Sequence, residues 1–523
     1  MKSLKLTLQY VFYLFILLLN LIRIAQWGFG HDENQFIAAG QLLADHGLLP
    51  YINYPYTHMP YGVLFYAITA GISNYDFLAG RVLNAAAWLI CCLLIVYIFR
   101  LIRRTKPSFP LLIWEFVIVL IFLNHPSILL IAGLALNHSL ASIFSLIALV
   151  FFILFVQQRY SRLWMAFGCG FCISLAAFIR FNYASLIVVL FLLFLTYKLV
   201  LNPPRILSSF LSFFGGSLIA ALPALGLIAI APNGFYFTNF VYTRLNTVYY
   251  QELLYKVNMD LGSKITGFLF HISPLDFILY ALLLCVGIAS FVQYIRKKSP
   301  VDLNKLAVAT FAFTLFLTAF APTPTQQQYY FAPLPFLVII LAMVGSDIYQ
   351  INKLGIYLTI LVMLFALDPK LKVSNPLDGL KYLTNPSQST PIQVHDFGEE
   401  IKQYVPKGKI LTLIPMIPLE AGYDIYPFTA SGPFIWRTSL LLTSQRRTKY
   451  GVISPEELPA VLSQDPPDAI LTGFEDPNAG FIRNDPGTLE TPFVNYAKEN
   501  RYTPISLYAS FIGRPITLWV RPN

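Results

Sequence analysis

Long apolar runs separated by short charged stretches constrain this chain more than any other feature of its sequence. A bilayer span needs about 20 mostly apolar residues, and about eleven such runs precede residue 369. Only 12% of the 523 residues are charged, against about 25% in a typical soluble protein, so a purely cytosolic enzyme is excluded. The predicted spans cover residues 6–27, 78–100, 109–125, 133–156, 163–180, 183–201, 206–230, 274–295, 303–321, 331–349 and 353–368.

The net charge of +10 predicts how these spans are oriented. Of the 21 Lys and Arg residues up to Asp368, 15 fall on one side of the spans, and the positive-inside rule makes that side the cytoplasm. A multi-pass protein of the inner or plasma membrane is expected, with a cytoplasmic N-terminus and residues 369–523 on the periplasmic or extracellular side. Nucleic-acid-binding modules concentrate basic residues in a soluble domain. The last 155 residues hold 15 basic and 15 acidic side chains, so no nucleic-acid partner is expected.

The C-terminal segment has the pattern of a small α/β domain. Helix-like stretches alternate with strand-like stretches, and Gly513-Arg514 between the last two strands predicts a hairpin. We therefore expect a transmembrane domain over residues 1–368 and an extracytoplasmic α/β domain over 369–523. The helix-like stretches lie near 396–405, 455–463 and 489–500, and the strand-like ones near 409–414, 468–473, 502–510 and 514–520.

The most informative polar segment follows the first span directly. Residues 28–62 place Asp32 and Glu33 at the membrane surface, where ionisable side chains are costly. The apolar residues from Phe36 to Leu43 then have the spacing of an amphipathic helix lying in the interface. One interpretation is structural, with Asp32 capping that helix and Glu33 complementing its dipole. The other is catalytic, because a rigid aromatic and proline-rich loop follows.

This segment resembles the first luminal loop of GT-C fold glycosyltransferases, above all the protein O-mannosyltransferase and lipid A aminoarabinose transferase (glycosyltransferase family 39-like) group. The resemblance covers the spans and the first loop, is weaker over 231–330, and is only architectural in the C-terminal segment. It implies a GT-C fold with a catalytic outer loop at about 28–77. It also implies a sugar donor carried by a polyprenyl phosphate and used on the non-cytoplasmic face. The matching residues are Asp32-Glu33, a helix of small residues ending at Gly47, Pro50-Tyr51, Pro60 and Gly80-Arg81.

The resemblance also implies roles for residues of this loop and the next span. Asp32 matches the family's loop carboxylate and is expected to be the general base that takes the acceptor's proton. Glu33 is expected to orient the acceptor or to pair with a cation. Arg81 is expected to pair with the two acidic residues or with the donor phosphate; an arginine extending to the lipid headgroups is the alternative. His58 is a candidate for sugar or phosphate binding, and a hydrogen-bonded structural histidine is an equally good interpretation.

Further candidates lie at the outer ends of later spans. Relatives often carry an acidic residue at the start of the fourth span, where this sequence has Asn137. That amide would bind a sugar hydroxyl or pack against another helix. Topology does not explain the outside cations Arg180, Arg244 and Lys264, so they are candidates for the lipid phosphate, with solvated interfacial charges as the alternative.

Gln328 and Tyr330 stand where similar enzymes have a polar residue followed by tyrosine. They would contact the donor or belong to the aromatic belt at the interface. Outer-face His and carboxylate residues lack the spacing of a zinc site, and the related mannosyl and aminoarabinosyl transferases do not depend on a catalytic metal. No metal or other cofactor is therefore expected. Oligosaccharyltransferases on the same fold do use a metal, which leaves a divalent cation at Asp32 open.

Together these features predict a membrane glycosyltransferase. It would move a sugar from a polyprenyl-phosphate carrier in the bilayer to an extracytoplasmic glycan, lipid or protein, by a single displacement with inversion. A transporter or flippase of lipid-linked intermediates is the alternative, and it would carry mid-span charges and repeat symmetry. The apolar runs are nearly free of charge, and we find no such symmetry. A non-catalytic membrane scaffold of the same fold is a third possibility.

Overall fold

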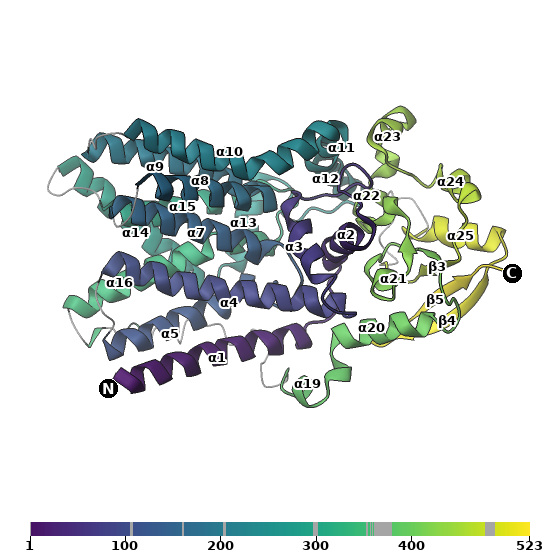
Figure 1. The fold of residues 1–523 in the computed structure, drawn as a ribbon, viewed down its shortest axis with the longest axis horizontal. Coiled ribbons are helices and arrows are strands. Elements are labelled where there is room, and N and C mark those ends of the chain that lie inside the picture. The colour runs from purple at the N-terminus through teal and green to yellow at the C-terminus, as the bar shows by residue number, and fades with distance from the viewer. Residues whose placement is uncertain are drawn as a thin grey trace.

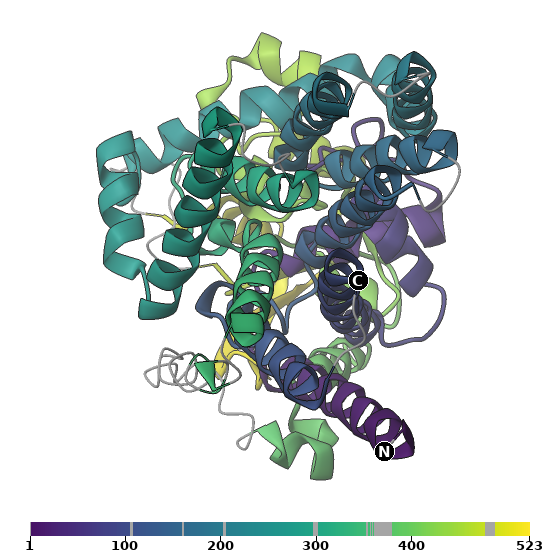
Figure 2. The same cartoon turned by 90° about the vertical axis from the view of Figure 1, so that its left-hand side faces the viewer.

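The protein is elongated, with a bundle of helices at the N-terminal end and an α/β domain at the C-terminal end (Figure 1). The computed structural model describes residues 2–104, 108–158, 162–201, 206–296, 302–351, 354, 355, 357, 359, 379–475 and 487–522. Figure 2 shows the bundle from its N-terminal end. Within the described residues, seven helices are long and apolar enough to cross a membrane, or eight if the bent pair Leu261–Phe270 and Pro274–Ala289 forms one span.

Each predicted span up to residue 349 coincides with a helix, because such runs satisfy their backbone hydrogen bonds internally and present apolar side chains to lipid. Two of these helices, α5 and α15, have only 15 and 17 residues. Most of the last predicted span, 353–368, lies outside the described residues. The helices are α1 Lys2–Gln26, α4 Asp76–Arg103, α5 Phe109–Leu123, α7 His138–Val156, α8 Arg162–Ile179, α9 Ser185–Leu201, α10 Ile206–Ile230, α14 Pro274–Arg296, α15 Leu303–Ala319 and α16 Leu334–Ile351.

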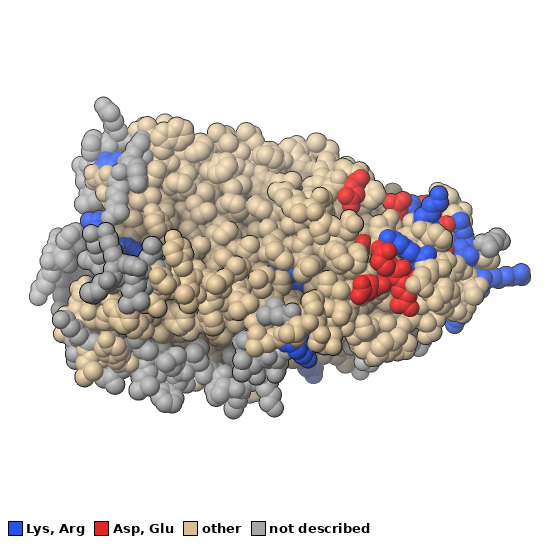
Figure 3. All heavy atoms as spheres, turned by 60° about the horizontal axis from the view of Figure 1, so that its bottom comes forward, with Lys and Arg blue, Asp and Glu red and all other residues tan. Residues whose placement is uncertain are grey.

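On the face that Figure 3 shows, Lys and Arg lie at one end, most other charged side chains lie toward the opposite end with a few near the middle, and a broad surface between them is uncharged. An uncharged band between charged ends is the surface expected of a protein surrounded by lipid. The chain is therefore an α-helical polytopic membrane protein. Its N-terminus and its C-terminal domain lie at opposite ends (Figure 1), an arrangement that the predicted orientation requires.

Two helices of the first outer loop, α2 Glu33–His46 and α3 Tyr61–Thr69, lie between the bundle and the α/β domain (Figure 1). Every residue of α2 from Glu33 to Leu42 is buried, so the prediction of an amphipathic helix in the interface is wrong. The physical reason is that the α/β domain covers the face that would otherwise meet water. Packing against α3 is close, since a Cβ atom on Gly40 would lie 2.5 Å from the Cβ of Tyr66.

Shorter helical segments complete the end of the bundle that faces the α/β domain. Pro126 begins α6 directly after α5, with its missing N–H at a position that needs no donor. The loop between α10 and α14 is mostly helical. These segments are α6 Pro126–Leu129, η1 Phe181–Ala184, α11 Pro232–Tyr236, η2 Phe237–Val241, α12 Tyr242–Glu252, α13 Leu261–His271 and η3 Gln327–Phe331.

The C-terminal domain is built on a mixed five-stranded sheet in the order β2-β1-β3-β5-β4. Strand β1 (Lys409–Leu411) pairs in parallel with β2 (Asp424–Ile425) and β3 (Ala469–Thr472). Strand β5 (Arg514–Val520) pairs antiparallel with β3 and with β4 (Thr503–Ala509). The predicted hairpin is thus confirmed, and Gly513 occupies its turn with φ +69°, a conformation that favours glycine.

The helices of this domain include all three predicted ones, as α20 Thr390–Ile401, α24 Leu458–Gln464 and α25 Thr491–Glu499. The remaining segments are too short for a hydrophobic period to show, so the sequence did not predict them. The boundary predicted after residue 368 lies outside the described residues. The short segments are α19 Lys381–Thr384, η4 Pro386–Gln388, α21 Met416–Glu420, η5 Pro427–Thr429, α22 Pro433–Trp436, η6 Ser439–Leu441 and α23 Ser444–Tyr450.

The α/β domain docks directly on the end of the bundle that lies opposite the N-terminus (Figure 1). The rings of Phe29 and Phe511 lie 5.4 Å apart, and Ser431 Oγ donates a hydrogen bond to the carbonyl oxygen of Pro55 at 2.5 Å. Near the N-terminus of α4, the Phe77 N–H donates to Glu420 Oε2 at 2.8 Å. These contacts join the two domains over the first outer loop.

The Glu420 contact makes stability depend on pH. Burial raises the pKa of Glu420 from 4.5 to about 8, so between these values the folded protein holds a proton that the unfolded chain has released. Stability is then lost as pH rises through this window. The Glu420→Gln variant keeps an acceptor for Phe77 N–H and a donor for His395 Nδ1, which lies 3.2 Å from Glu420 Oε1. We expect its melting temperature in detergent to fall less between pH 5 and 8 than that of the wild type.

Glu499→Gln provides the matched control, because Glu499 is exposed at the end of α25. Its pH profile should follow the wild type. If melting temperature falls with pH equally in the wild type and in Glu420→Gln, Glu420 is already ionised in the folded protein.

Candidate functional site

Arg81 and Glu33 form a fully buried ion pair below the first outer loop. Arg81 Nε donates to Glu33 Oε1 at 2.9 Å, and Arg81 Nη2 donates to Oε2 at 2.7 Å. The other donors of Arg81 bind the carbonyl oxygens of Ile24 (3.0 Å), Trp27 (2.9 Å) and Gly28 (2.6 Å) at the end of α1. All five N–H groups of a guanidinium are therefore used, and none is left for a phosphate.

The carboxylate of Glu33 is equally committed. Besides Arg81, its Oε1 accepts from the Ala135 N–H at 2.6 Å and its Oε2 from the Gly30 N–H at 3.0 Å. The side chain is completely buried. Glu33 therefore pairs with a cation of the protein itself, and its geometry favours a positioning role over contact with an acceptor.

Asp32, the neighbouring carboxylate, has almost no partners. It lies at the N-cap position of α2, but its side chain makes no capping hydrogen bond, so the structural interpretation of Asp32 as a cap is not what the structure shows. Its one hydrogen bond to a described residue comes from Gln328 Nε2, at 3.4 Å from Oδ2. The side chain is partly exposed. Asp32 is thus an available base at the positive end of a helix.

Arg180, which directly follows α8, lies close enough to Asp32 to interact electrostatically. Its Nη1 donates to Asn137 Oδ1 at 2.8 Å and lies 3.0 Å from His138 Nε2. Its Nε is buried without a hydrogen-bond partner, and within the described residues Arg180 forms no ion pair. Burial lowers the pKa of Arg180 because it disfavours the charged guanidinium. An oxyanion beside Arg180 would therefore stabilise its positive charge.

Asn137 has the task of holding Arg180. Its Nδ2 donates to the carbonyl oxygen of Ile179 at 3.1 Å, while its Oδ1 accepts from Arg180. The side chain is completely buried, so this arrangement favours positioning over direct contact with a sugar.

His58 lies on the same outer loop, with its ring stacked on Phe36 at 4.7 Å. Burial and the positive charge of Arg180 lower the pKa of His58 to about 3. The ring is therefore neutral near pH 7, and it makes no hydrogen bond to any described residue. A neutral imidazole can bind a sugar hydroxyl, but it brings no positive charge to a phosphate.

Two predicted phosphate ligands lie elsewhere. Lys264 Nζ donates to the carbonyl oxygen of Phe320 at 2.9 Å and to Thr323 Oγ1 at 2.8 Å, which fixes the segment before η3. Arg244 is exposed on α12, two residues from Tyr242. Residues two apart on a helix point in roughly opposite directions, so Arg244 faces away from the contacts that Tyr242 makes.

At the start of the last described span, the residue near Asp32 is Tyr329 and not the predicted Tyr330. Tyr329 lies close enough to interact electrostatically with both Asp32 and Arg180. The ring of Tyr330 packs instead against Phe268 at 5.0 Å. Of the two residues predicted in this segment, Gln328 contacts Asp32 and Tyr330 does not, because the 3-10 turn directs Tyr329 toward Asp32 and buries Tyr330.

The C-terminal domain adds residues near Asp32 that no local sequence pattern predicted. His31, next to Asp32, lies 3.2 Å from Glu475 Oε1, and its ring is 5.3 Å from that of Phe434. Arg437 Nη2 donates to Asn246 Oδ1 on α12 at 2.6 Å. The run Phe434 to Arg437, a cation among aromatic side chains, was the one signal in the sequence that could have marked this contact.

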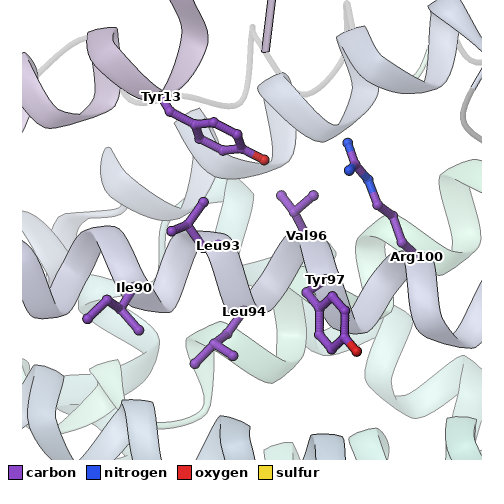
Figure 4. A pocket seen from close by; sticks show the side chains of 7 residues that line it. All are labelled: Tyr13, Ile90, Leu93, Leu94, Val96, Tyr97 and Arg100. Atoms are coloured by element: carbon purple, nitrogen blue, oxygen red, sulfur yellow. The ribbon is translucent and has the colours of Figure 1, made fainter. Parts of the chain in front are cut away.

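A separate cavity of about 380 Å³ lies between α1 and α4 (Figure 4). Its residues on α4 follow Arg81 by 9 to 19 positions, which is roughly 14 to 28 Å along a helix, so this cavity is not part of the Asp32 site. Among the described residues, no three His, Cys, Asp or Glu side chains are grouped to hold a metal ion. The cavity is lined by Tyr13, Ile90, Leu93, Leu94, Val96, Tyr97 and Arg100.

No protein-family model matches the chain, and no curated protein matches its sequence. Solved structures do match. ArnT from Cupriavidus metallidurans in the apo state covers 99% of this chain and 98% of its own, with 11% identity and a TM-score of 0.58. The structure of the same protein bound to undecaprenyl phosphate covers 98% of this chain and 97% of its own, with 12% identity and a TM-score of 0.56. A third match is the oligosaccharyltransferase AglB from Archaeoglobus fulgidus in complex with an inhibitory peptide and a dolichol-phosphate. It covers 97% of this chain and 73% of its own, with 14% identity and a TM-score of 0.51.

The chain has the GT-C fold. This confirms the fold that the first outer loop and the spans implied. At identities of 11 to 14% the likeness concerns architecture, so the roles of individual residues rest on the geometry of this chain. In that geometry the GT-C site contains one available carboxylate, Asp32, beside one committed carboxylate, Glu33.

The contrast between the two carboxylates predicts that breaking the Glu33–Arg81 pair destabilises the protein and that neutralising Asp32 does not. Arg81→Ala leaves the buried charge of Glu33 unpaired, and breaking such a pair typically costs about 3–5 kcal/mol. We expect a large drop in melting temperature for Arg81→Ala. Asp32→Asn, at a partly exposed carboxylate with one long hydrogen bond, should melt like the wild type. Equal melting temperatures for the wild type and Arg81→Ala would contradict the role of the pair.

Proposed function

We propose that the protein is a glycosyltransferase that moves a sugar from a polyprenyl-phosphate carrier to an acceptor on the extracytoplasmic side. The observation that carries the proposal is that an available carboxylate, Asp32, lies near Arg180, a cation that forms no ion pair among the described residues. The fold supports it, because ArnT has been seen bound to undecaprenyl phosphate and AglB in complex with a dolichol-phosphate.

The proposed reaction is a single displacement. The hydroxyl oxygen of the acceptor attacks the anomeric carbon while Asp32 takes its proton. The bond between the anomeric carbon and the phosphate oxygen breaks, and its electron pair leaves with the polyprenyl phosphate. Arg180 stabilises the charge that develops on that phosphate. Attack opposite the leaving group inverts the anomeric configuration.

The surrounding residues have supporting tasks in this proposal. The buried pair of Glu33 and Arg81 fixes the backbone that presents Asp32, and Asn137 fixes Arg180. Neutral His58 and the amide of Gln328 are suited to sugar hydroxyls. A donor in the outer leaflet and an acceptor outside the membrane, whether glycan, lipid or protein, would meet at this level. No cofactor is part of the proposal, and assay after dialysis against a chelator tests the cation left open at Asp32.

The decisive variant is Asp32→Asn. A positioned general base contributes typically 10²–10⁴-fold, so sugar transfer from a polyprenyl-phosphate donor by purified protein should fall by about that factor. Membrane insertion and binding of undecaprenyl phosphate should be unchanged. Unchanged transfer would overturn the proposal, and loss of lipid translocation without any glycosidic bond formation would identify a transporter instead.

Arg180 gives an independent test of the phosphate contact. Hydrogen bonds to charged groups contribute about 1.5–3 kcal/mol, so Arg180→Gln should weaken binding of undecaprenyl phosphate by roughly 10-fold or more. Titration of the purified protein with this lipid measures the effect. Arg244→Gln, which removes an exposed arginine of the same outer surface, should leave the affinity unchanged. Equal losses for the two variants would mean that only net charge matters.

A further inference from the structure

Arg437 reaches from the C-terminal domain to the outer end of the bundle. It follows α22 and donates from Nη2 to Asn246 Oδ1 at 2.6 Å, and the same nitrogen lies 3.5 Å from the Tyr242 hydroxyl oxygen. Its guanidinium carbon lies 5.0 Å from the ring centre of Tyr249 and 5.0 Å from that of Phe434. The guanidinium is therefore enclosed by aromatic rings from both domains.

This arginine has no carboxylate partner within the described residues. Arg447, also in the C-terminal domain, is paired with Glu456 and Glu457 at 2.5 and 2.7 Å. Arg437 instead has a buried Nε without a hydrogen-bond partner. Burying an unpaired charge is costly, and contact with aromatic faces offsets only part of that cost. Within the part of the chain that the structure describes, no carboxylate compensates this charge, so an anion beside Arg437 would be favourable.

The position of Arg437 connects it to the candidate base. Tyr242 interacts electrostatically with both Arg437 and Asp32. On the other side, the ring of Phe434 contacts Arg437 and also His31, the residue before Asp32. Tyr329 in turn links Asp32, Arg180 and Tyr242 by electrostatic contact. Arg437 is thus linked to the Asp32 site through Tyr242 on one side and through Phe434 and His31 on the other.

We propose that Arg437 is a second cation of the transfer site and binds an oxyanion of a substrate there. The proposal rests on the proposed function and adds that the C-terminal domain completes the site. The shared chemistry is a phosphate or carboxylate oxyanion, which an arginine fork binds through its N–H groups. Its source is the phosphate of the lipid donor or an acidic group of the acceptor, and the experiment separates the two.

The test uses the full-length protein in detergent, with undecaprenyl phosphate as the probe. Arg437→Gln should weaken its binding by roughly 10-fold or more, the change expected for a lost hydrogen bond to a charged group. Arg437→Lys keeps the charge without the planar fork and should recover part of the affinity. Arg446→Gln, at an exposed arginine of α23, is the matched control and should bind like the wild type.

Asn246→Leu separates ligand binding from domain docking. It removes the anchor of Arg437 but keeps the guanidinium, so it should weaken lipid binding much less than Arg437→Gln does. If Asn246→Leu reproduces the full loss, Arg437 only docks the domain, and the proposal is overturned. Comparison of melting temperatures ensures that all variants are measured as folded protein.

Steady-state transfer identifies the source of the oxyanion. A loss of affinity for undecaprenyl phosphate assigns Arg437 to the donor. Unchanged lipid affinity with a raised acceptor KM assigns it to an acidic acceptor, and no change in either overturns the proposal. Lipid binding needs no turnover, so the binding measurements can be repeated with the Arg437 substitutions introduced into the Asp32→Asn variant. A failure of Asp32 as the base is thereby distinguished from a failure of Arg437 as a ligand.

Discussion

The arrangement of the outer surface depends on the buried pair of Arg81 and Glu33. Two charges removed from water are stable only when nearly every remaining donor and acceptor is satisfied. Here the last carbonyl groups of α1, the N–H groups of Gly30 and Ala135, and the two side chains satisfy one another. The pair therefore locks the end of α1, the start of α2, α4 and the segment before α7 into one geometry. The position of Asp32 is fixed by this geometry, because Asp32 directly precedes Glu33.

Both carboxylate oxygens of Glu33 are occupied by hydrogen bonds within this pair and its neighbours. Glu33 therefore has a structural role, and the adjacent Asp32 is the carboxylate that stays available for chemistry. Asp32 is left with one long hydrogen bond and with cations nearby that lack carboxylate partners in the described chain. The α/β domain contacts this region through His31 and Glu475, and Asp32 stays only partly exposed. Electrostatic interactions are stronger in such a partly enclosed site than in water. A single carboxylate in a partly enclosed site therefore interacts more strongly with nearby charges than a carboxylate that is fully exposed to water does.

The sequence predicted what depends on local patterns and missed what depends on distant contacts. Apolar runs gave the spans up to residue 349, and the turn at Gly513 gave the terminal hairpin. Helix α2 was predicted to be amphipathic because nothing local indicates that a domain more than 300 residues later covers it. Tyr329 was missed by one position because the turn that aims it has no periodic signature. Arg437 was missed because its partners lie on α12, near residue 246.

A site divided between two domains has a thermodynamic consequence. If one anion contacts Arg180 on the bundle and Arg437 on the C-terminal domain, its binding favours the docked arrangement over any arrangement that separates them. By linkage, whatever stabilises docking also tightens the binding of that anion. The buried carboxyl of Glu420 at the same domain contact is neutral below about pH 8 and then docks without a charge to desolvate. Domain docking, the protonation state of Glu420 and occupancy of the phosphate site are therefore expected to change together.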